Sequence, residues 1–305
     1  MLSPDVRIAR IAVRQHGVFA FDQALSCGFT PDTVAYRLKS GRWRRLHRGV
    51  YLLVGVEVSF ATRTLAAVLA AGSGAVTSFA AAAVLYQVED FHPGTIEISV
   101  PRRTSPDLKA VVVHRVDLPR LDKTEVTRIP VTTPSRTIID LASDLEADPL
   151  EDALHSFVRR KMIDPPALEA RVGAMQRRGR RGAGTLLKLL RGLTSENVSG
   201  SGWENKVRRL LVRAGLEEPI RQFMISDEDG NFVARPDLSY PSRRVYIEYD
   251  GGRHLDRRRR ARDLDRQNLL SALGWRPLIF TEGDFRKPHS AIVAKVRRAT
   301  ATSER

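Results

Sequence analysis

Apolar and polar positions in residues 1–56 alternate in a way that predicts three short helices followed by a hairpin. Apolar residues recur at helical spacing through residues 6–15, and residues 21–26 form a second apolar segment. Thr30 followed by Pro31 predicts the N-cap and first turn of a third helix. Three short helices and a following basic hairpin are the pattern of a winged helix-turn-helix.

The third helix and the hairpin carry the residues that we expect to face DNA. Ala35 and Leu38 are predicted to turn toward the core of the module, and residues 42–53 to form two short strands. In a winged helix the third helix enters the major groove while the hairpin lies near phosphates. The predicted DNA-contacting residues are Thr33, Tyr36 and Arg37 on the helix and Arg42, Arg44, Arg45 and Arg48 on the hairpin. A small helical protein-interaction module is the alternative interpretation.

The sequence pattern of residues 57–192 predicts an α/β region, and we assign no catalytic or binding chemistry to it. Alternating apolar residues at 94–101 and 110–116 predict two strands. Residues 64–88 carry no charge, but Gly72-Ser73-Gly74 interrupts them. The uncharged stretch therefore predicts two small-residue helical segments around a turn, and no membrane span.

Two charged features of the middle region are expected to lie at its surface. Arg136 and Asp140 stand four residues apart on a predicted helix, which favours a surface ion pair. The basic, glycine-spaced stretch at 177–182 is expected to be a solvated loop. The histidines of this region show no metal-ligand spacing.

A Gly- and Ser-rich linker at 193–202 predicts that a further domain, residues 203–305, follows it. The pattern there predicts a helix, three strands, a helix, a strand and a last helix. The expected segments are 203–214, 221–225, 231–237, 245–250, 257–273, 276–280 and 289–298. This order is that of a restriction-endonuclease-like core, so the predicted fold class is multidomain α/β.

Charge is distributed unevenly along the chain, which has 50 basic and 35 acidic residues and a formal charge of +15. Residues 1–56 carry +6 and residues 203–305 carry +7, whereas residues 57–202 carry only +2. Two basic ends favour a polyanionic partner such as DNA. Cys27 is the only cysteine, which excludes an internal disulfide and a cysteine metal site. The N-terminus lacks a signal-peptide pattern, so we expect a cytoplasmic protein.

Three acidic residues near the C-terminus are candidates for metal chemistry. Glu248 and Asp250 stand two apart in an apolar strand, so both point to one face, and a bend would bring Asp237 beside them. Carboxylates held together repel each other and lose hydration, and a divalent cation removes that cost. Oxygen ligands suit Mg²⁺, or Mn²⁺ in its place.

The N-terminal segment resembles the AbiEi-type antitoxins of type IV toxin–antitoxin systems. The likeness is carried by Gly17-Val-Phe19, by Gly28-Phe-Thr30 and by the run from Gly41 to Tyr51. It continues weakly through residues 132–140. The resemblance implies that the module binds promoter DNA and represses its own operon, and that a cognate toxin is a partner.

The C-terminal segment resembles the PD-(D/E)XK nuclease superfamily, in particular its branch similar to very-short-patch repair endonucleases. Pro236-Asp237, then Glu248-x-Asp250-Gly251, then His254 carry the likeness, supported by Arg262-Asp263, Leu270 and Gly274-Trp275. The resemblance implies that Asp237 and Glu248 bind Mg²⁺ with the carbonyl of Tyr249. It also implies that Glu204 holds a metal-bound water or a second ion.

Two positions depart from the nuclease pattern. Asp250 occupies the place of the superfamily's lysine, which leaves His254 as the candidate general acid or base. Ile279 stands where an arginine is expected. The acidic residues also have structural interpretations: Glu204 completes a capping box with Ser201, Asp237 caps a turn, and Glu248 with Asp250 lies on an exposed edge strand.

Two functions from different classes follow from the sequence. The main hypothesis is a DNA-binding protein with a Mg²⁺-dependent endonuclease domain that cleaves phosphodiester bonds. The alternative is a non-catalytic transcriptional autorepressor, an antitoxin whose nuclease-like fold has lost its activity. The clustered carboxylates favour the enzyme, and the departures at Asp250 and Ile279 favour the regulator.

Overall fold

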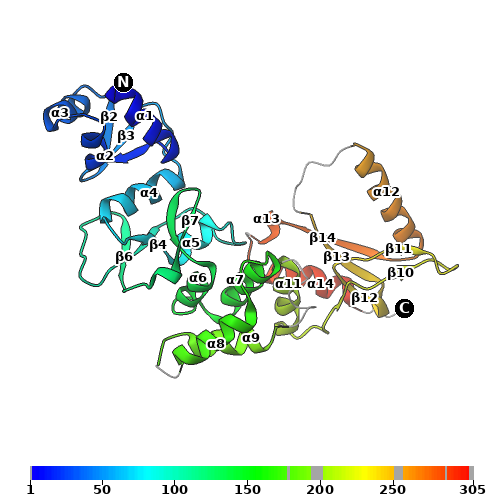
Figure 1. Cartoon of the computed structure of the whole chain (residues 1–305). Coiled ribbons are helices and arrows are strands. Elements are labelled where there is room, and N and C mark those ends of the chain that lie inside the picture. The colour runs from blue at the N-terminus through cyan, green and yellow to red at the C-terminus, as the bar shows by residue number, and fades with distance from the viewer. Residues whose placement is uncertain (1, 177–178, 194–201, 251–256, 286, 302–305) are drawn as a thin grey trace. The chain divides into compact units, whose positions relative to one another are not determined.

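The computed structural model describes residues 2–176, 179–193, 202–250, 257–285 and 287–301, and Figure 1 shows its elements. The chain divides into two compact units, residues 1–193 and 194–305, and each is described by itself. Among the residues that the structure describes, no helix combines the length and apolar character needed to cross a bilayer. The linker predicted at 193–202 lies, except for Leu193 and Gly202, outside the described residues.

The first unit begins with three helices and a three-stranded antiparallel sheet. The elements are α1 (Pro4–Arg14), β1 (Val18–Ala20), α2 (Phe21–Ser26), α3 (Pro31–Lys39), β2 (Trp43–His47) and β3 (Val50–Leu53). Strand order is β1-β3-β2, so β2 is an edge strand. Phe19, Phe29, Trp43 and Tyr51 form an aromatic core beneath the helices, with Phe19 and Trp43 in edge contact at 4.8 Å between centroids.

Helix α3 begins and turns largely as its sequence dictates. The Thr30 side chain accepts from the Thr33 amide at the N-cap, and Pro31 occupies the first turn. Leu38 packs against the core as predicted. The prediction for Ala35 was wrong: Ala35 is exposed and Val34 is buried at 2% exposure. The larger apolar side chain of Val34 takes the core position, because it buries more surface than a methyl group.

The same unit continues with a five-stranded sheet of order β6-β5-β4-β8-β7. Its elements are α4 (Phe60–Ala71), β4 (Val76–Thr77), α5 (Phe79–Leu85), β5 (Ile96–Val100), β6 (Val111–Arg115), η1 (Arg120–Asp122), β7 (Lys123–Val126) and β8 (Ile129–Thr132). The uncharged stretch forms most of α4, all of β4 and α5, and most of its alanines are buried. Val18, Leu52, Leu65 and Ile129 share one apolar cluster, so the N-terminal elements pack directly on α4 and the second sheet.

Four helices complete the first unit: α6 (Pro134–Leu141), α7 (Ala147–Arg159), α8 (Pro165–Gln176) and α9 (Ala183–Arg191). They enclose the largest apolar cluster, centred on Ile138, Leu150 and Phe157. Figure 1 shows α8 and α9 beside each other below α6 and α7. The cluster therefore fixes this helical layer on the second sheet.

The predicted surface pair of Arg136 and Asp140 is instead buried. Arg136 is 5% exposed and Asp140 is fully buried, with 2.8 Å between their charged atoms. Asp122 and Arg171 extend the network, joined at 2.6 Å, and Arg180 reaches Asp140 at 2.9 Å. The four-residue spacing correctly predicted the ion pair between Arg136 and Asp140. Helix α8 and the loop before α9 bury this pair. A buried charge needs partners, and these arginines provide them.

The described part of the loop before α9 packs against the rest of the unit, whereas the sequence predicted a solvated loop. Gly182 adopts φ +77°, and a Cβ at this position would lie 1.7 Å from the carbonyl oxygen of Ala142. Only glycine allows the loop to approach the end of α6 this closely. Residues 177 and 178 of the predicted loop lie outside the described part of the chain.

The second unit contains a mixed four-stranded sheet of order β14-β13-β12-β9. Strands β13 (Val245–Asp250) and β14 (Arg276–Thr281) are parallel, whereas β12 (Leu238–Tyr240) is antiparallel to β13 and to β9 (Ile220–Arg221). Helices α11 (Gly202–Arg213) and α14 (Ser290–Thr300) supply the apolar cluster on one face. Helix α12 (Arg257–Ala272) packs through Leu270 with Tyr246 of β13 on the other.

The predicted strand at 231–237 is longer than the strand in the structure. Strand β11 (Phe232–Ala234) ends before Pro236 and pairs with β10 (Ile225–Ser226) in a separate two-stranded sheet. A proline has no N–H to donate to a strand ladder, so pairing stops there and restarts at Leu238. The remaining short elements are η2 (Pro241–Arg243) and α13 (Glu282–Phe285).

Candidate functional site

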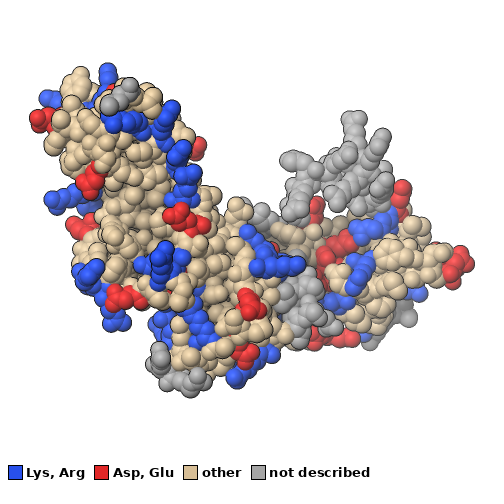
Figure 2. All heavy atoms as spheres, viewed as in Figure 1, with Lys and Arg blue, Asp and Glu red and all other residues tan. Residues whose placement is uncertain are grey.

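Strand β2 presents arginines along an unpaired sheet edge. Trp43 turns inward at 4% exposure, while Arg44 and Arg45 are exposed. Arg42 immediately before the strand and Arg48 in the following turn are exposed as well. Figure 2 shows a row of Lys and Arg side chains along one side of the N-terminal elements. The edge strand and its turn therefore offer four solvated guanidinium groups, each a bidentate donor for phosphate.

The predicted contacts on α3 differ in how accessible they are. Tyr36 is 62% exposed, and Thr33 lies at the exposed start of the helix. Arg37 donates to Asp5 at 2.8 Å and its guanidinium lies over the Phe29 ring. The Arg37 side chain is only 19% exposed, so it stabilises the junction of α1 and α3 in this arrangement.

In the second unit, strand register brings the predicted acidic residues together. Leu238 of β12 pairs with Ile247 of β13, which places the preceding Asp237 beside Glu248 on the neighbouring strand. Burial, together with the negative charges of Glu204 and Glu248, raises the pKa of Asp237 to about 6. Hydrogen bonds from the Tyr249 amide and the Gln222 side chain oppose that rise. The carboxylates of Glu204 in α11, of Asp237 just before β12 and of Glu248 in β13 thus share one electrostatic site.

Arginines partner two of the three carboxylates. Glu204 is 2% exposed and accepts from Arg221 of β9 at 3.1 Å. Glu248 accepts from Arg266 of α12 through both oxygens, at 2.6 and 3.1 Å. Asp237 accepts from the Gln222 side chain at 3.3 Å. The site is therefore a mixed cluster of carboxylates and guanidinium groups.

The carboxylates of Glu204, Asp237 and Glu248 are of the type that binds a hard divalent cation, but they are not positioned to coordinate one together. Carboxylate oxygens are the ligands that Mg²⁺ and Mn²⁺ prefer, and burial with the charges of Glu204 and Glu248 raises the pKa of Asp237. Among the described residues, however, no group of three His, Cys, Asp or Glu side chains lies close enough to hold a metal ion. A cation at Glu248 would first have to displace a guanidinium.

The other predicted residues of this site fall in different places. Asp250 is exposed at the end of β13. The Tyr249 ring stacks on Trp203 with 5.1 Å between centroids. Ile279 pairs with Glu248 in the parallel ladder and is 43% exposed. His254 lies outside the residues that the structure describes, as do Gly251 and Ser201 of the motifs.

Arg221, Gln222 and Arg266 are the site residues that sequence reasoning missed. A usable signal existed for Arg266, which stands four residues before Leu270. Residues four apart share a helix face, so an inward Leu270 places Arg266 toward the same sheet. Arg221 ends the two-residue strand β9 and Gln222 follows it, and so short a strand gives no periodic signal.

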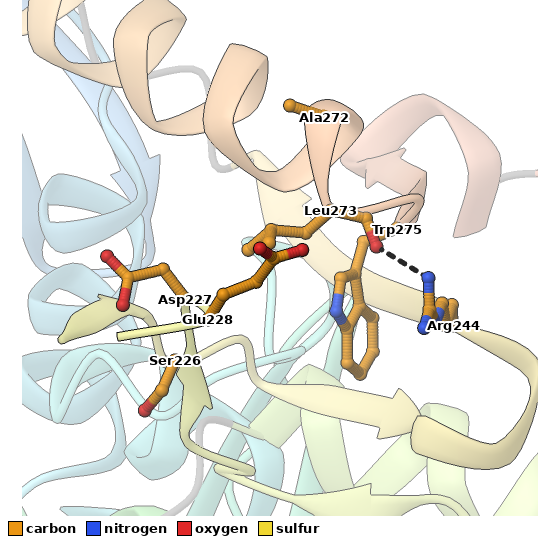
Figure 3. A pocket seen from close by; sticks show the side chains of 7 residues that line it. All are labelled: Ser226, Asp227, Glu228, Arg244, Ala272, Leu273 and Trp275. Carbon is orange, nitrogen blue, oxygen red and sulfur yellow. Dashed lines mark hydrogen bonds between the residues drawn. The ribbon is translucent and has the colours of Figure 1, made fainter. Parts of the chain in front are cut away.

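A separate cavity of about 270 Å³ lies at the C-terminal end of α12 (Figure 3). Its lining residues are Ser226, Asp227, Glu228, Arg244, Ala272, Leu273 and Trp275. The Asp227 carboxylate is engaged with amides of its own turn and with Asn231, and Arg244 donates to the Leu273 carbonyl at 3.0 Å. None of the acidic-site residues lines this cavity.

Comparison with protein families identifies the first unit. Residues 6–54 match the model described as "Transcriptional regulator, AbiEi antitoxin". Residues 74–189 match the model of the AbiEi antitoxin C-terminal domain. The chain carries an AbiEi-type antitoxin region. Both matches lie within the first unit, and they bear out the AbiEi-type resemblance of the sequence; neither supports a nuclease assignment.

Comparison with individual proteins adds little further. The crystal structure of the RV2827C protein from Mycobacterium tuberculosis is similar at a TM-score of 0.43 and 14% sequence identity. The similarity covers 73% of this chain and 88% of that one. A search of curated proteins gave no significant match.

Proposed function

We propose that the protein is a DNA-binding transcriptional regulator of the AbiEi antitoxin type, with residues 1–56 acting as a winged helix. The AbiEi-type antitoxin region supports the class of function. The observation that carries the DNA-binding role is the edge strand β2, whose Arg44 and Arg45 are exposed between Arg42 and Arg48. In this proposal α3 enters the major groove with Thr33 and Tyr36, while the arginines bind phosphates on either side.

This assignment reverses the order of the two functions that the sequence favoured. The antitoxin-type regulator, which stood as the alternative, is now the leading function, because the comparisons support it over a nuclease. A cognate toxin is the expected protein partner. The middle region, residues 74–189, is the proposed surface for that toxin, since it is the part that matches the antitoxin C-terminal domain.

Salt dependence of DNA affinity tests the role of the edge strand. Each phosphate contact contributes about −0.9 to the slope of log affinity against log salt. Arg45→Gln should therefore weaken binding to all duplexes alike and make the slope less negative by about 0.9. Arg103→Gln, which removes the same charge from an exposed site after β5, is the matched control. The edge strand is not the phosphate-binding element if both variants lose affinity equally.

A second function, Mg²⁺-dependent cleavage of phosphodiester bonds, remains a proposal for the second unit. It is favoured by the shared electrostatics of Glu204, Asp237 and Glu248 on a sheet in which β13 and β14 are parallel. A divalent cation bound there would supply an activated water and neutralise developing phosphate charge. The chain's own residues would hold the cation through Asp237 and Glu248.

Cleavage assays decide this second function directly. Wild type should cut duplex, single-stranded or mismatched DNA in the presence of Mg²⁺ or Mn²⁺, and Asp237→Ala should not. The nuclease proposal fails if wild type shows no cation-dependent cleavage on any of these substrates, and the regulator proposal then stands alone.

A further inference from the structure

Two of the α3 residues that the sequence favoured for DNA contact are already engaged within the protein. The Thr33 hydroxyl donates to the Thr30 carbonyl at 2.8 Å and accepts from the Thr30 amide at 2.7 Å. Arg37 is paired with Asp5 at 2.8 Å, lies over the Phe29 ring and has a side chain that is only 19% exposed. Thr33 is therefore left with its methyl group for DNA, and the single arginine of α3 is not placed to bond a guanine.

A different set of α3 side chains faces solvent together. Asp32, Ala35, Tyr36 and Lys39 are all exposed, and Tyr36 is 62% exposed. Their spacing of three, four and seven residues places them on one helix face, opposite the buried Val34. No hydrogen bond or ion pair engages the side chains of Asp32, Tyr36 or Lys39 within the part of the chain that the structure describes. Figure 1 shows α3 at the outer edge of the N-terminal elements, so this face is open to a ligand.

The chemistry of Asp32 restricts what it can contact in a major groove. An ionised carboxylate only accepts hydrogen bonds, and it is repelled by phosphates. Cytosine presents its N4 amino group as a donor in the groove, whereas the amino group of adenine lies beside the N7 acceptor of the same base. Asp32 is the second residue of α3, and the N-terminal residues of a recognition helix are those that reach base edges. Asp32 is therefore placed to bond a cytosine.

Ala35 adds an apolar contact next to Asp32. Its side chain is a methyl group that is exposed and carries no polar atom. Such a group packs against the C5-methyl of thymine in the major groove. Side chains three residues apart on a helix have Cβ atoms about 5–6 Å apart, and successive bases rise by about 3.4 Å. The bases contacted by Asp32 and Ala35 are therefore one or two base pairs apart.

The later part of the same face suits the DNA backbone. Tyr36 carries a hydroxyl group, and Lys39 in the last turn carries an ammonium group. Tyrosine and lysine side chains commonly bind phosphate oxygens, and such contacts fix the register of a protein on the duplex without reading its sequence. Base reading is therefore concentrated in the first half of α3.

We propose that α3 reads a cytosine through Asp32 and the methyl group of a neighbouring thymine through Ala35. This inference rests on the proposed function, DNA binding by the winged helix, and it names the base pairs that the DNA target contains. It also accounts for an acidic residue on the DNA-facing surface of a basic module. At a site without a cytosine the carboxylate would have no donor and would lie near phosphates, so Asp32 disfavours wrong sequences.

Enrichment of duplexes from a random-sequence library by the full chain tests the role of Asp32. Wild type should enrich duplexes in which a cytosine and a thymine recur one or two base pairs apart. Asp32→Asn should change the preferred base from cytosine to adenine, because asparagine bonds the N6 and N7 atoms of adenine. Asp22→Asn is the matched control, since Asp22 is the exposed second residue of α2. It should leave the preferred sequence unchanged.

Replacing the selected thymine by uracil tests the role of Ala35, because this change removes only the C5-methyl group. Wild type should bind the uracil duplex about threefold to fourfold more weakly, the value of one buried methyl-sized group. Ala35→Gly should bind the two duplexes equally. The measured quantity is a ratio of two affinities for one protein, so a loss of helix stability in the variant cancels. Uracil in place of a thymine outside the selected site should change nothing.

The outcomes separate this inference from the function beneath it. A selected sequence that is the same for wild type and Asp32→Asn overturns reading by Asp32, and the DNA-binding regulator remains. Equal binding of the thymine and uracil duplexes by wild type overturns the Ala35 contact in the same way. A wild-type protein that enriches no sequence contradicts the proposed regulator and this inference together.

Discussion

Replacing Asp237 by asparagine should stabilise the second unit at neutral pH, although it removes a charged residue from the proposed site. Asp237 is half buried and lies beside Glu204 and Glu248, which raises its pKa from 3.8 to about 6. The folded state thus binds a proton more tightly than the unfolded state does. The contribution of Asp237 to stability is fully present below pH 3.8 and is lost as the pH rises through 6.

The size of the effect follows from the pKa difference. A rise from 3.8 to about 6 corresponds to about 3 kcal/mol of destabilisation above pH 7. Solvent screening at a partly exposed side chain reduces this to about 1.5 kcal/mol. Asp237→Asn should remove that cost at pH 7.5 and change little at pH 4. Asparagine retains a carbonyl oxygen that accepts from the Tyr249 amide, so the strand junction should persist.

Hydrogen exchange of the β12 and β13 amides in the full chain, in the presence of a chelator, measures this change. A gain of about 1.5 kcal/mol slows exchange roughly tenfold. Amides of β5 in the first unit serve as the internal control and should not change. Asp284→Asn should act in the opposite direction, because the hydrogen bonds from Lys295 and from the Thr281 amide lower the pKa of Asp284 to about 2. Faster exchange in Asp237→Asn at pH 7.5, or an equal gain at pH 4, would refute the reasoning.

Two further stability predictions use matched pairs of variants. The Tyr246 hydroxyl is buried with no hydrogen-bond partner among the described residues, so Tyr246→Phe should stabilise the protein by about 1 kcal/mol in urea unfolding. Tyr240→Phe should cost about 1 kcal/mol, since its hydroxyl donates to the Glu217 carbonyl at 2.8 Å, and equal effects of the two variants would contradict this view. Gly182→Ala should cost about 3 kcal/mol or more from its backbone angle and its contact with the Ala142 carbonyl. Gly179→Ala, with a similar φ and open space around it, should cost only about 1 to 2 kcal/mol, and comparable melting temperatures for the two would disprove the contact argument.

The sequence correctly predicted elements that a capping residue or a short run of alternating apolar residues defines. The cap at Thr30 and the proline after it located α3, and the alternation of Val245, Ile247 and Tyr249 located β13. The position of Asp237 beside Glu248 also followed, because two strands that pair through Leu238 and Ile247 must bring their neighbours together.

Features that depend on tertiary packing were not accessible from the sequence. The spacing of Arg136 and Asp140 predicted their pairing but gave no sign that α8 and the loop before α9 would bury it. The arginines at the acidic site come from β9 and α12, separated from their carboxylate partners by 17 and 18 residues. No periodicity links such positions, so only the packing of α12 on β13 reveals that Glu248 is already neutralised.

The measurement that tests the proposed function most directly is the affinity of the full chain for the promoter of its own gene, compared with a shuffled duplex of equal length at physiological salt. A specific regulator should prefer its promoter by about 10³-fold or more. Substituting Arg42, Arg44, Arg45 and Arg48 together by glutamine should sharply reduce binding to both duplexes. Equal affinity of wild type for the promoter and the shuffled duplex would contradict the assignment of this protein as a transcriptional regulator.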